Sequence, residues 1–216
     1  HFKKEVAMKL YDCQMAPNPR RARVFINEKG LDIPTHEINI LEGENLKDDY
    51  VKVNSSKLVP ALELDDGKII CEVPAICRYL EATHPEPNLM GVDPYETAMV
   101  EQWERYAEMG GMQAVAEVFR NQLPAFTERG LPGLTNVGAI PALIERGKQR
   151  LEAFYARLEE RLGESEFLAS NRFTFADITG MCVVDFATFA KVGIPAGNTN
   201  TQRWHGACAG RPSAKA

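Results

Sequence analysis

Two features near the amino terminus have the residue types for peptide binding and for thiol chemistry. In Val59-Pro60 the bond before proline can adopt the cis form, which other peptide bonds rarely do. A cis Pro60 would turn the backbone amide and carbonyl of Val59 outward, where an extended peptide could pair with them as one more strand. The alternative is an ordinary trans proline at a strand edge. Cys13 could form a mixed disulfide, but it has no C-x-x-C partner, which favours a buried and unreactive thiol.

The elements around Val59-Pro60 determine which alternative holds. Asp66-Gly67 stands between two apolar runs and predicts a hairpin with a two-residue turn. Asn18-Pro19 predicts a helix start, with Asn18 as the N-cap and proline in the first position. The other expected elements are strands at 8–12 and 36–40, a short helix near 46–53 and a helix over 74–84. This βαβαββα order predicts a small mixed sheet flanked by helices, a thioredoxin-like domain over 8–84, and favours a cis Pro60.

The second half of the chain has a different pattern. Residues 85–94 are rich in Pro, Asn and Gly and predict a linker, while 1–7 has the look of an expression-tag remnant. Helical periodicity over about 95–119, 139–162 and 175–192 predicts an all-helical domain over 95–216. Thr174 and Asp177 form a capping box before an apolar run, which gives Asp177 a structural role. The fold class is therefore α/β followed by all-α.

Composition narrows the class of partner. The formal net charge of −5 argues against nucleic acid or an acidic membrane as the main partner. No apolar run reaches the roughly 18 residues that cross a bilayer. The five cysteines show neither a disulfide framework nor the spacing of a metal site, so we expect no metal and a reducing cytoplasm. Arg20, Arg21 and Arg23 oppose the helix dipole in the first turns of their helix, which indicates that at least one of them serves a partner, although a solvated face is expected for any single one.

Several motifs together resemble cytosolic glutathione S-transferases. The match extends over nearly the whole chain from Met8, and the motifs are Val59-Pro60, Glu63-Leu64-Asp65-Asp66-Gly67, Ile76-Cys77-Arg78-Tyr79-Leu80 and Ala16-Pro17-Asn18-Pro19-Arg20-Arg21. The resemblance implies a thioredoxin-like domain that binds glutathione as co-substrate and a helical domain that binds the electrophile. It places Val59 at the cysteinyl backbone of glutathione, and Glu72 with Val73 at the γ-glutamyl end. Asn45 and Lys57 are the candidates for the glycyl carboxylate.

The sequence departs from the family pattern at two of these positions. Val73 stands where serine is usual, which leaves only the backbone amide for the glutamyl carboxylate and predicts weaker binding. Ala16 stands where most classes have the Ser, Cys or Tyr that activates the thiol. The pattern resembles a fungal-type and bacterial subgroup without that side chain, in which helix amides and a water serve instead. Asn18 is the candidate donor, with a simple cap as its alternative, and Asn121 with Gln122 are the candidates to hold the water.

The resemblance implies a homodimeric, cytoplasmic detoxification enzyme that joins the glutathione thiolate to a small apolar electrophile. Trp103, Tyr106, Met109, Met112 and Phe119 form an apolar stripe that we expect to be mainly core, with a subset lining the electrophile site. Mid-helix Gly110-Gly111 would permit a kink or the close approach of a ligand. Two alternatives remain: a glutathione-dependent disulfide reductase or peroxidase, through Cys13 or the bound thiolate, and a non-catalytic glutathione-binding protein.

Overall fold

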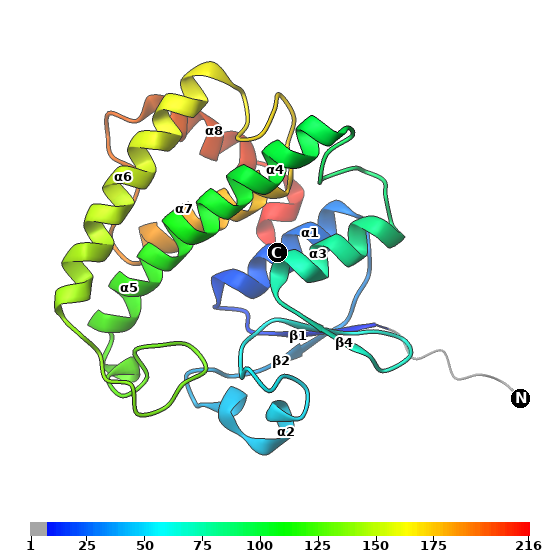
Figure 1. Ribbon diagram of the computed structural model, residues 1–216, viewed down its shortest axis with the longest axis vertical. Coiled ribbons are helices and arrows are strands. Elements are labelled where there is room, and N and C mark those ends of the chain that lie inside the picture. The colour runs from blue at the N-terminus through cyan, green and yellow to red at the C-terminus, as the bar shows by residue number, and fades with distance from the viewer. Residues whose placement is uncertain (1–7) are drawn as a thin grey trace, which may run out of the picture.

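The computed structural model describes residues 8–216, so the predicted tag remnant at 1–7 lies outside the described residues. The first half contains a four-stranded sheet in the order β2-β1-β3-β4. Strand β1 (Lys9–Asp12) pairs parallel with β2 (Thr35–Glu37) and antiparallel with β3 (Ala61–Glu63), and β4 (Ile69–Cys71) is antiparallel to β3. Helices α1 (Pro17–Glu28) and α3 (Val73–Thr83) lie on one side, and α2 (Asp48–Val51) lies on the other (Figure 1). This is the predicted thioredoxin-like arrangement.

The Val59–Pro60 bond is cis, as predicted, and it leads directly into β3. The hairpin is confirmed, but its predicted two-residue turn at Asp66-Gly67 is wrong, because the hydrogen bond between Leu64 and Lys68 encloses three residues, 65–67. Leu64 donates its amide to the Lys68 carbonyl at 2.8 Å, and Gly67 has φ +83°. The left-handed Gly67 accommodates the third residue as a bulge, which is the common solution for a loop of this length.

Two predicted boundaries change in the structure. The strand expected at 36–40 ends at Glu37, because after Ile38 donates its amide to the Asp12 carbonyl at 2.8 Å the chain turns away from the sheet. Helix α1 begins at Pro17, so Asn18 is inside the helix and its prediction as N-cap is wrong. The N-cap is Ala16, which precedes proline and has the extended conformation that this position favours (φ −88°, ψ 137°).

The arginines of α1 do not form the solvated face that their charge suggested. Arg21 is fully buried, and Arg23 is nearly so and pairs with Asp12. Arg20 donates to Asp185 Oδ2 at 2.6 Å and to the Ala214 carbonyl at 2.9 Å. Each cation has a partner elsewhere in the chain, and for Arg20 that partner is in the helical half.

The helical half is built around a buried central helix, α7 (Phe175–Phe189). The helix expected over 95–119 is instead α4 (Pro94–Tyr106), a π-helical turn at Ala107–Met112 and α5 (Gln113–Gln122), followed by α6 (Ala142–Glu164) (Figure 1). The π-turn contains Gly111, where a Cβ would lie 2.7 Å from Val183 Cγ1 of α7, so glycine allows the two helices to meet. Helix α8 (Thr199–Ala209) was not predicted. Within residues 8–216 no helix has the length and apolar character needed to cross a bilayer.

The capping box at the start of α7 is confirmed. Asp177 Oδ2 accepts the Thr174 amide at 2.9 Å, and Oδ1 accepts the Leu168 amide and Trp204 Nε1, each at 2.9 Å. These contacts join α7 to the preceding loop and to α8, which is the structural role expected of this carboxylate.

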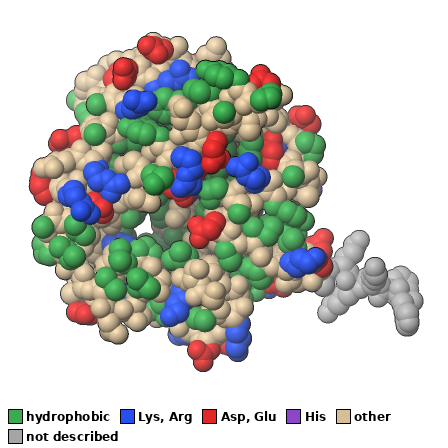
Figure 2. Space-filling view, in the orientation of Figure 1, with side chains coloured by type: hydrophobic (Ala, Val, Ile, Leu, Met, Phe, Trp, Pro, Cys, Tyr) green, Lys and Arg blue, Asp and Glu red, His purple; other side chains and the backbone are tan. Residues whose placement is uncertain are grey.

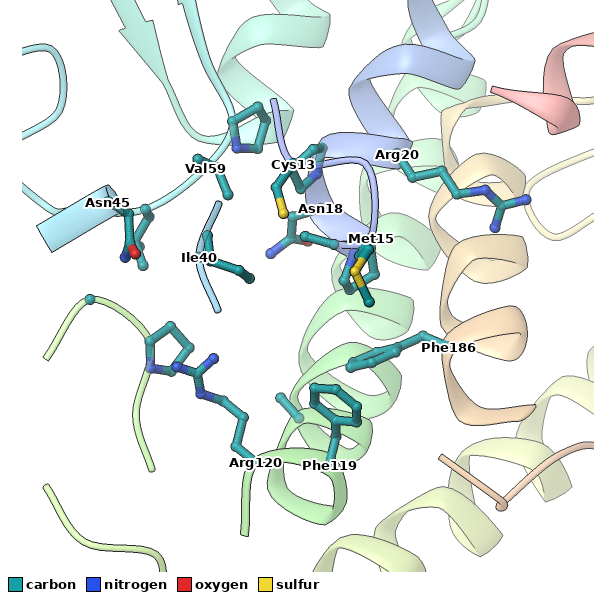
Figure 3. Close-up of a pocket in the computed structure, with 18 of the residues that line it drawn as sticks. Cys13, Met15, Asn18, Arg20, Ile40, Asn45, Val59, Phe119, Arg120 and Phe186 are labelled. Atoms are coloured by element: carbon teal, nitrogen blue, oxygen red, sulfur yellow. The ribbon is translucent and has the colours of Figure 1, made fainter. Parts of the chain in front are cut away.

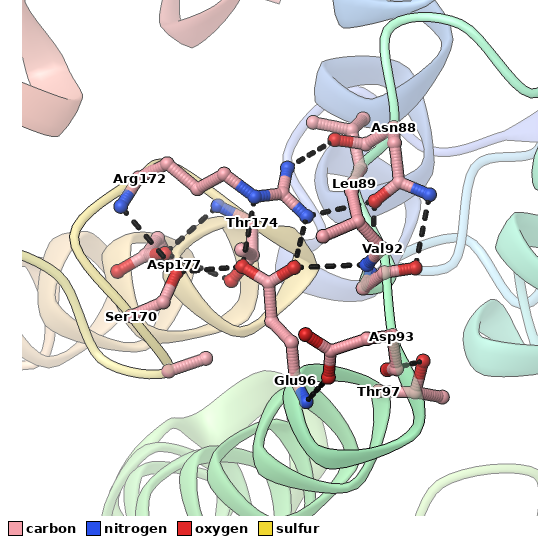
Figure 4. A network of polar contacts seen from close by, with 12 residues as sticks. Asn88, Leu89, Val92, Asp93, Glu96, Thr97, Ser170, Arg172, Thr174 and Asp177 are labelled. Atoms are coloured by element: carbon pink, nitrogen blue, oxygen red, sulfur yellow. Dashed lines mark hydrogen bonds and ion pairs between the residues drawn. The ribbon is translucent and has the colours of Figure 1, made fainter.

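A second polar network joins the segment between the two halves to α4 (Figure 4). Arg172 contacts Glu96 through Nε and Nη2, both at 2.8 Å, and donates Nη2 to Asn88 Oδ1 at 2.8 Å. These hydrogen bonds lower the pKa of Glu96 to about 2. The ion pair therefore holds the segment between α3 and α4 against the start of α4 and the loop before α7.

Candidate active site

A cavity of about 680 Å³ lies between the sheet half and the helical half. Figure 2 shows the surface hollowed between α5 and the start of α1, and Figure 3 shows the side chains that extend into this space. One wall consists of the β1–α1 loop, the start of α1, the segment that ends in Val59-Pro60 and the start of α3. The facing wall consists of α5, the loop after it and α7. Both halves of the chain are thus needed to form the cavity.

The structure places all six predicted site residues on the wall of this cavity: Asn18, Asn45, Lys57, Val59, Glu72 and Val73. They come from four separate segments, because Lys57 and Val59 lie in one loop and Glu72 and Val73 are neighbours in sequence. Val59 is at the cis bond, where the chain changes direction before β3. The cavity therefore offers free backbone, a carboxylate and amide groups within one space, which suits a short peptide that has charged ends.

Glu72 has an unusual backbone for a residue with a side chain. Its dihedral angles are φ +68° and ψ 126°, outside the usual left-handed well, and it is the N-cap of α3. Its side chain is exposed to the cavity. Val73 then begins α3, and since Pro74 has no amide, Val73 is the first N–H at this helix end. The Glu72 carboxylate, held on a strained backbone next to a helix amide, can bind an amine while that amide binds a carboxylate of the same ligand.

Asn18 is held in one orientation by a buried network. Its Oδ1 accepts from Arg21 Nη1 at 2.9 Å, which assigns Oδ1 to the interior and leaves Nδ2 on the cavity side. Arg21 also donates to Glu104 Oε1 at 2.5 Å, Glu108 Oε1 at 3.1 Å and Thr179 Oγ1 at 3.1 Å. Burial raises the pKa of Glu104 to about 7. Arg21 thus connects the start of α1 to α4, the π-turn and α7.

The amino terminus of α1 has few free amides. Pro17 and Pro19 have no N–H, and the Ala16 amide donates to the Cys13 carbonyl at 2.9 Å. Among the first residues of the helix, Asn18 is therefore the one that offers both a backbone amide and a side-chain amide. The amides expected to serve in place of the missing side chain are therefore those of one residue, Asn18, and not those of the whole first turn of the helix.

Comparison with known proteins agrees with this geometry. The glutathione S-transferase N-terminal domain model matches residues 16–83, and the C-terminal domain model matches residues 135–212. Glutathione S-transferase 2 of Saccharomyces cerevisiae is 30% identical over 213 residues, covering 96% of this chain and 88% of that protein. The chain belongs to the glutathione S-transferase family. It is a glutathione transferase, with glutathione as its co-substrate.

Solved structures give the same result. A glutathione S-transferase domain-containing protein from Marinobacter aquaeolei is 36% identical with a TM-score of 0.86, covering 95% of this chain and 98% of that one. A glutathione S-transferase of class Gtt2 from Vibrio parahaemolyticus is 33% identical with a TM-score of 0.81, covering 95% of this chain and 94% of that one. The thioredoxin-like half and the helical half thus match this family as one continuous fold.

The two candidates for the glycyl end of glutathione are linked to each other. Asn45 Nδ2 donates to the Lys57 carbonyl at 2.8 Å, while Asn45 Oδ1 is buried without a partner. Lys57 has φ +61°, a left-handed conformation that is rare outside glycine, asparagine and aspartate. Asn45 therefore fixes the backbone just before Val59-Pro60, and Lys57 supplies the flexible cation.

The cysteines fit the inert interpretation better than the reactive one. Cys13 is buried and lines the cavity, and burial raises the pKa of its thiol. Cys182 also lines the cavity, and burial raises its pKa to about 11. All five cysteines are free in the structure, and Cys71 is the one that is only partly buried. Within residues 8–216 no cluster of three or more His, Cys, Asp or Glu residues could hold a metal ion.

The polar residues predicted to hold a water are outside the cavity. Asn121 donates Nδ2 to the Glu117 carbonyl at 2.7 Å and accepts the Ile140 amide at 2.7 Å, so its amide is used in joining α5 to the following loop. Gln122 does not line the cavity either. The prediction of this pair as water ligands is wrong, because neither residue lines the cavity and the Asn121 amide is bonded within the helical half.

The apolar stripe divides as predicted. Trp103 and Tyr106 pack edge to face with ring centroids 5.6 Å apart, away from the cavity wall, while Met112 and Phe119 line it. Met109 is half exposed and belongs to neither group. Sequence reasoning missed the remaining aromatic and cationic wall residues, Arg120, Phe126, Arg129, Phe186 and Phe189. No sequence signal marks them, because they come from α5, a loop and α7 and meet only after folding.

Proposed function

We propose that this glutathione transferase joins the glutathione thiolate to a small electrophile with an apolar body. The observation that supports this most is the shape of the cavity: the free edge at Val59 faces the apolar wall of Met112, Phe119 and Phe186. Glutathione supplies the thiol nucleophile, and the two walls bring it and the electrophile together. Such approximation, with stabilisation of the thiolate, accounts for catalysis without an acid or base side chain.

For the peptide part, we assign binding to the backbone and to two helix ends. The amide and carbonyl of Val59 pair with the cysteinyl residue as a strand edge does. The Glu72 carboxylate binds the γ-glutamyl amine, and the Val73 amide binds the glutamyl carboxylate, where the dipole of α3 favours an anion. Asn45 and Lys57 serve the glycyl carboxylate. The placement of all these residues on the wall of one cavity supports this assignment of the glutathione-binding residues.

For the thiol, we assign activation to Asn18. Its backbone N–H and Nδ2 are the donors at the positive end of α1, and Arg21 keeps Oδ1 turned away from the sulfur side. A hydrogen bond to the thiolate favours the charged form and lowers the thiol pKa from its ordinary value of about 8.5. The absence of a hydroxyl at Ala16 agrees with the bacterial and fungal-type subgroup of the family.

The test is conjugation of glutathione to a chromogenic aryl halide, together with retention on immobilised glutathione. We expect both. Retention without conjugation would support the non-catalytic binding protein instead. Hydroperoxide or disulfide turnover with a silent aryl halide assay would support the peroxidase or reductase alternative, against which the burial and raised pKa of Cys13 count.

We further propose a cytoplasmic homodimer with a domain boundary in 85–94, as membership in the family suggests. Light scattering on the purified protein tests the oligomeric state: a mass of one chain would contradict the dimer. Limited proteolysis tests the boundary. Cleavage within 85–94, giving fragments of the two halves, is expected, and cleavage confined to the helical half would contradict it.

A further inference from the structure

Arg120 is a cation in the cavity that has no counterion in the part of the chain that the structure describes. It stands on α5 next to Phe119, half buried, and its guanidinium extends into the space below Ile40 (Figure 3). Its Nε is buried without a hydrogen-bond partner, and the guanidinium lies 4.2 Å from the Phe126 ring centroid. Among residues 8–216 no carboxylate forms an ion pair with it. Another cation, Arg129, lies near the same Phe126 ring, and burial together with that charge lowers the pKa of Arg120 to about 10.

Four acidic residues line the cavity, and among residues 8–216 none of them forms an ion pair with Arg120: Glu37, Glu72, Glu108 and Asp185. Glu37 accepts the Gln14 amide at 3.1 Å, and Glu72 is at the start of α3 on the sheet side. Glu108 accepts from Arg21 and Arg105, at 3.1 and 2.5 Å. Asp185 accepts from Arg20 at 2.6 Å and contacts the His205 ring at the same distance. Neither carboxylate is available to Arg120.

Arg129 differs from Arg120 in having a structural use. It donates to the carbonyls of Ile40 and Leu41, at 3.0 and 2.9 Å, and so ties the loop after α5 to the sheet half. Its guanidinium is also near the Phe126 ring, at 5.5 Å. Among residues 8–216, Arg120 and Lys57 are therefore the cavity cations whose side chains form no hydrogen bond, and Lys57 lies on the sheet side beside Asn45. The positive charge of Arg129 adds to the attraction of the helical wall for an anion.

A partly buried charge without a partner costs free energy, and folded proteins usually pair it. When the unpaired group faces a ligand cavity, the partner expected is part of the ligand. Guanidinium binds carboxylate most strongly, in two parallel hydrogen bonds. We propose that the electrophile has a carboxylate, and that Arg120 binds it. This rests on the proposed function, and it makes the acceptor an organic acid with an apolar body, not a neutral apolar molecule.

The location favours the electrophile over glutathione itself as the source of this carboxylate. Arg120 is on the helical wall beside Phe119, opposite the segment of Val59, whereas Asn45 lies at the sheet side (Figure 3). The glutathione carboxylates have Val73 and the Asn45 and Lys57 pair on that sheet side. A group that packs against Phe119 places its own anion at Arg120.

The experiment compares a chloronitrobenzoate with its neutral carboxamide as acceptors. In both reactions the sulfur–carbon bond forms and chloride leaves, so no other reactant is needed. After correction for the uncatalysed rates, we expect wild type to prefer the benzoate by at least about tenfold in kcat/KM. Arg120→Met should abolish the preference and Arg120→Lys should keep part of it. Arg146→Met, which removes an exposed guanidinium of α6 outside the cavity, should keep all of it.

A binding measurement repeats the comparison without turnover. Calorimetry with the two purified glutathione conjugates should show the same preference in wild type and its loss in Arg120→Met. A preference that survives Arg120→Met, or is absent from wild type, overturns the proposal. A raised KM for glutathione with the preference intact shows that Arg120 holds glutathione, and overturns it too. If wild type conjugates neither acceptor, the proposed conjugation fails, while the binding arm still decides the role of Arg120.

Discussion

Replacement of Asn18 tests the mechanism at its least expected point, because an amide side chain stands in for the missing hydroxyl. Asn18→Ala removes Nδ2 but keeps the backbone N–H at the start of α1. The fold loses little by this change: Arg21 Nη1 keeps Glu108 Oε1 as an acceptor at 3.1 Å. Asn18→Asp is the isosteric companion, since it keeps an oxygen for Arg21 and replaces the donor by a carboxylate.

The expected change in the thiol pKa and in kcat/KM follows from the loss of one charge-assisted hydrogen bond. Such a bond contributes about 1.5–3 kcal/mol, which corresponds to a rise of about 1 to 2 units in the pKa of the bound thiol. At a pH below that pKa, the thiolate fraction and kcat/KM fall by about 10- to 100-fold. As pH rises through the raised pKa, the variant regains thiolate and its rate approaches that of wild type. Asn18→Asp should lose more, because its carboxylate repels the thiolate.

The assays are the pH profile of kcat/KM with an aryl halide and an ultraviolet titration of the thiolate in the glutathione complex. Both should shift to higher pH in Asn18→Ala. Cys13→Ala serves as the matched control in the same cavity and should keep the wild-type profile. An unshifted profile for Asn18→Ala would refute Asn18 as the donor, and loss of activity in Cys13→Ala would replace it with the cysteine mechanism.

Three further predictions follow from single positions. Val73→Ser adds the hydroxyl that the family usually has there, and calorimetry should show glutathione binding several-fold tighter. Gly111→Ala places a Cβ 2.7 Å from Val183 Cγ1, and should lower the free energy of unfolding by about 1–3 kcal/mol in urea titrations. Glu96→Gln weakens the pairing with Arg172. In the folded protein the pKa of Glu96 is about 2, compared with an ordinary value of 4.5. The ionised Glu96 therefore contributes fully to the free energy of unfolding above pH 4.5, and this contribution is lost as the pH falls toward 2. The variant should be less stable by about 2 kcal/mol at neutral pH, with the difference closing in that range.

Each of these has a control in the chain. Val73→Ala separates lost packing from the added hydroxyl, and equal affinity in the two variants would contradict a role for the Ser hydroxyl. Gly206→Ala in α8 meets nothing within 4 Å and should be neutral or stabilising, so an equal loss there would contradict the steric argument. Glu101→Gln breaks the exposed pair with Arg78 and should change stability little; a pH-independent loss in Glu96→Gln would show that its charge is irrelevant.

Local sequence patterns determined much of the molecule. Turn and proline chemistry located the hairpin and the cis bond at Val59–Pro60, and helical periodicity located α4 to α7. The capping box of Asp177 was equally readable, because its partners lie within one turn. These features depend on residues near one another in the chain. The family resemblance, carried by local motifs such as Val59-Pro60, predicted six residues that the structure places on the cavity wall.

The pairing of charged side chains was decided only by the tertiary structure, because it depends on residues far apart in the chain. The local charge pattern of Arg20, Arg21 and Arg23 favoured a solvated face, yet the carboxylates that pair with them come from β1, α4, the π-turn and α7. The same distance in sequence hid Arg120. Its lack of a counterion is visible only in the folded structure, where none of the carboxylates that line the cavity forms an ion pair with it among residues 8–216. Hydrogen bonds and ion pairs act over a few ångströms in space, whatever the separation of the residues along the chain. The local backbone motifs therefore predicted the edge that binds the peptide. Which charged side chains remain free for a ligand was decided by the fold alone.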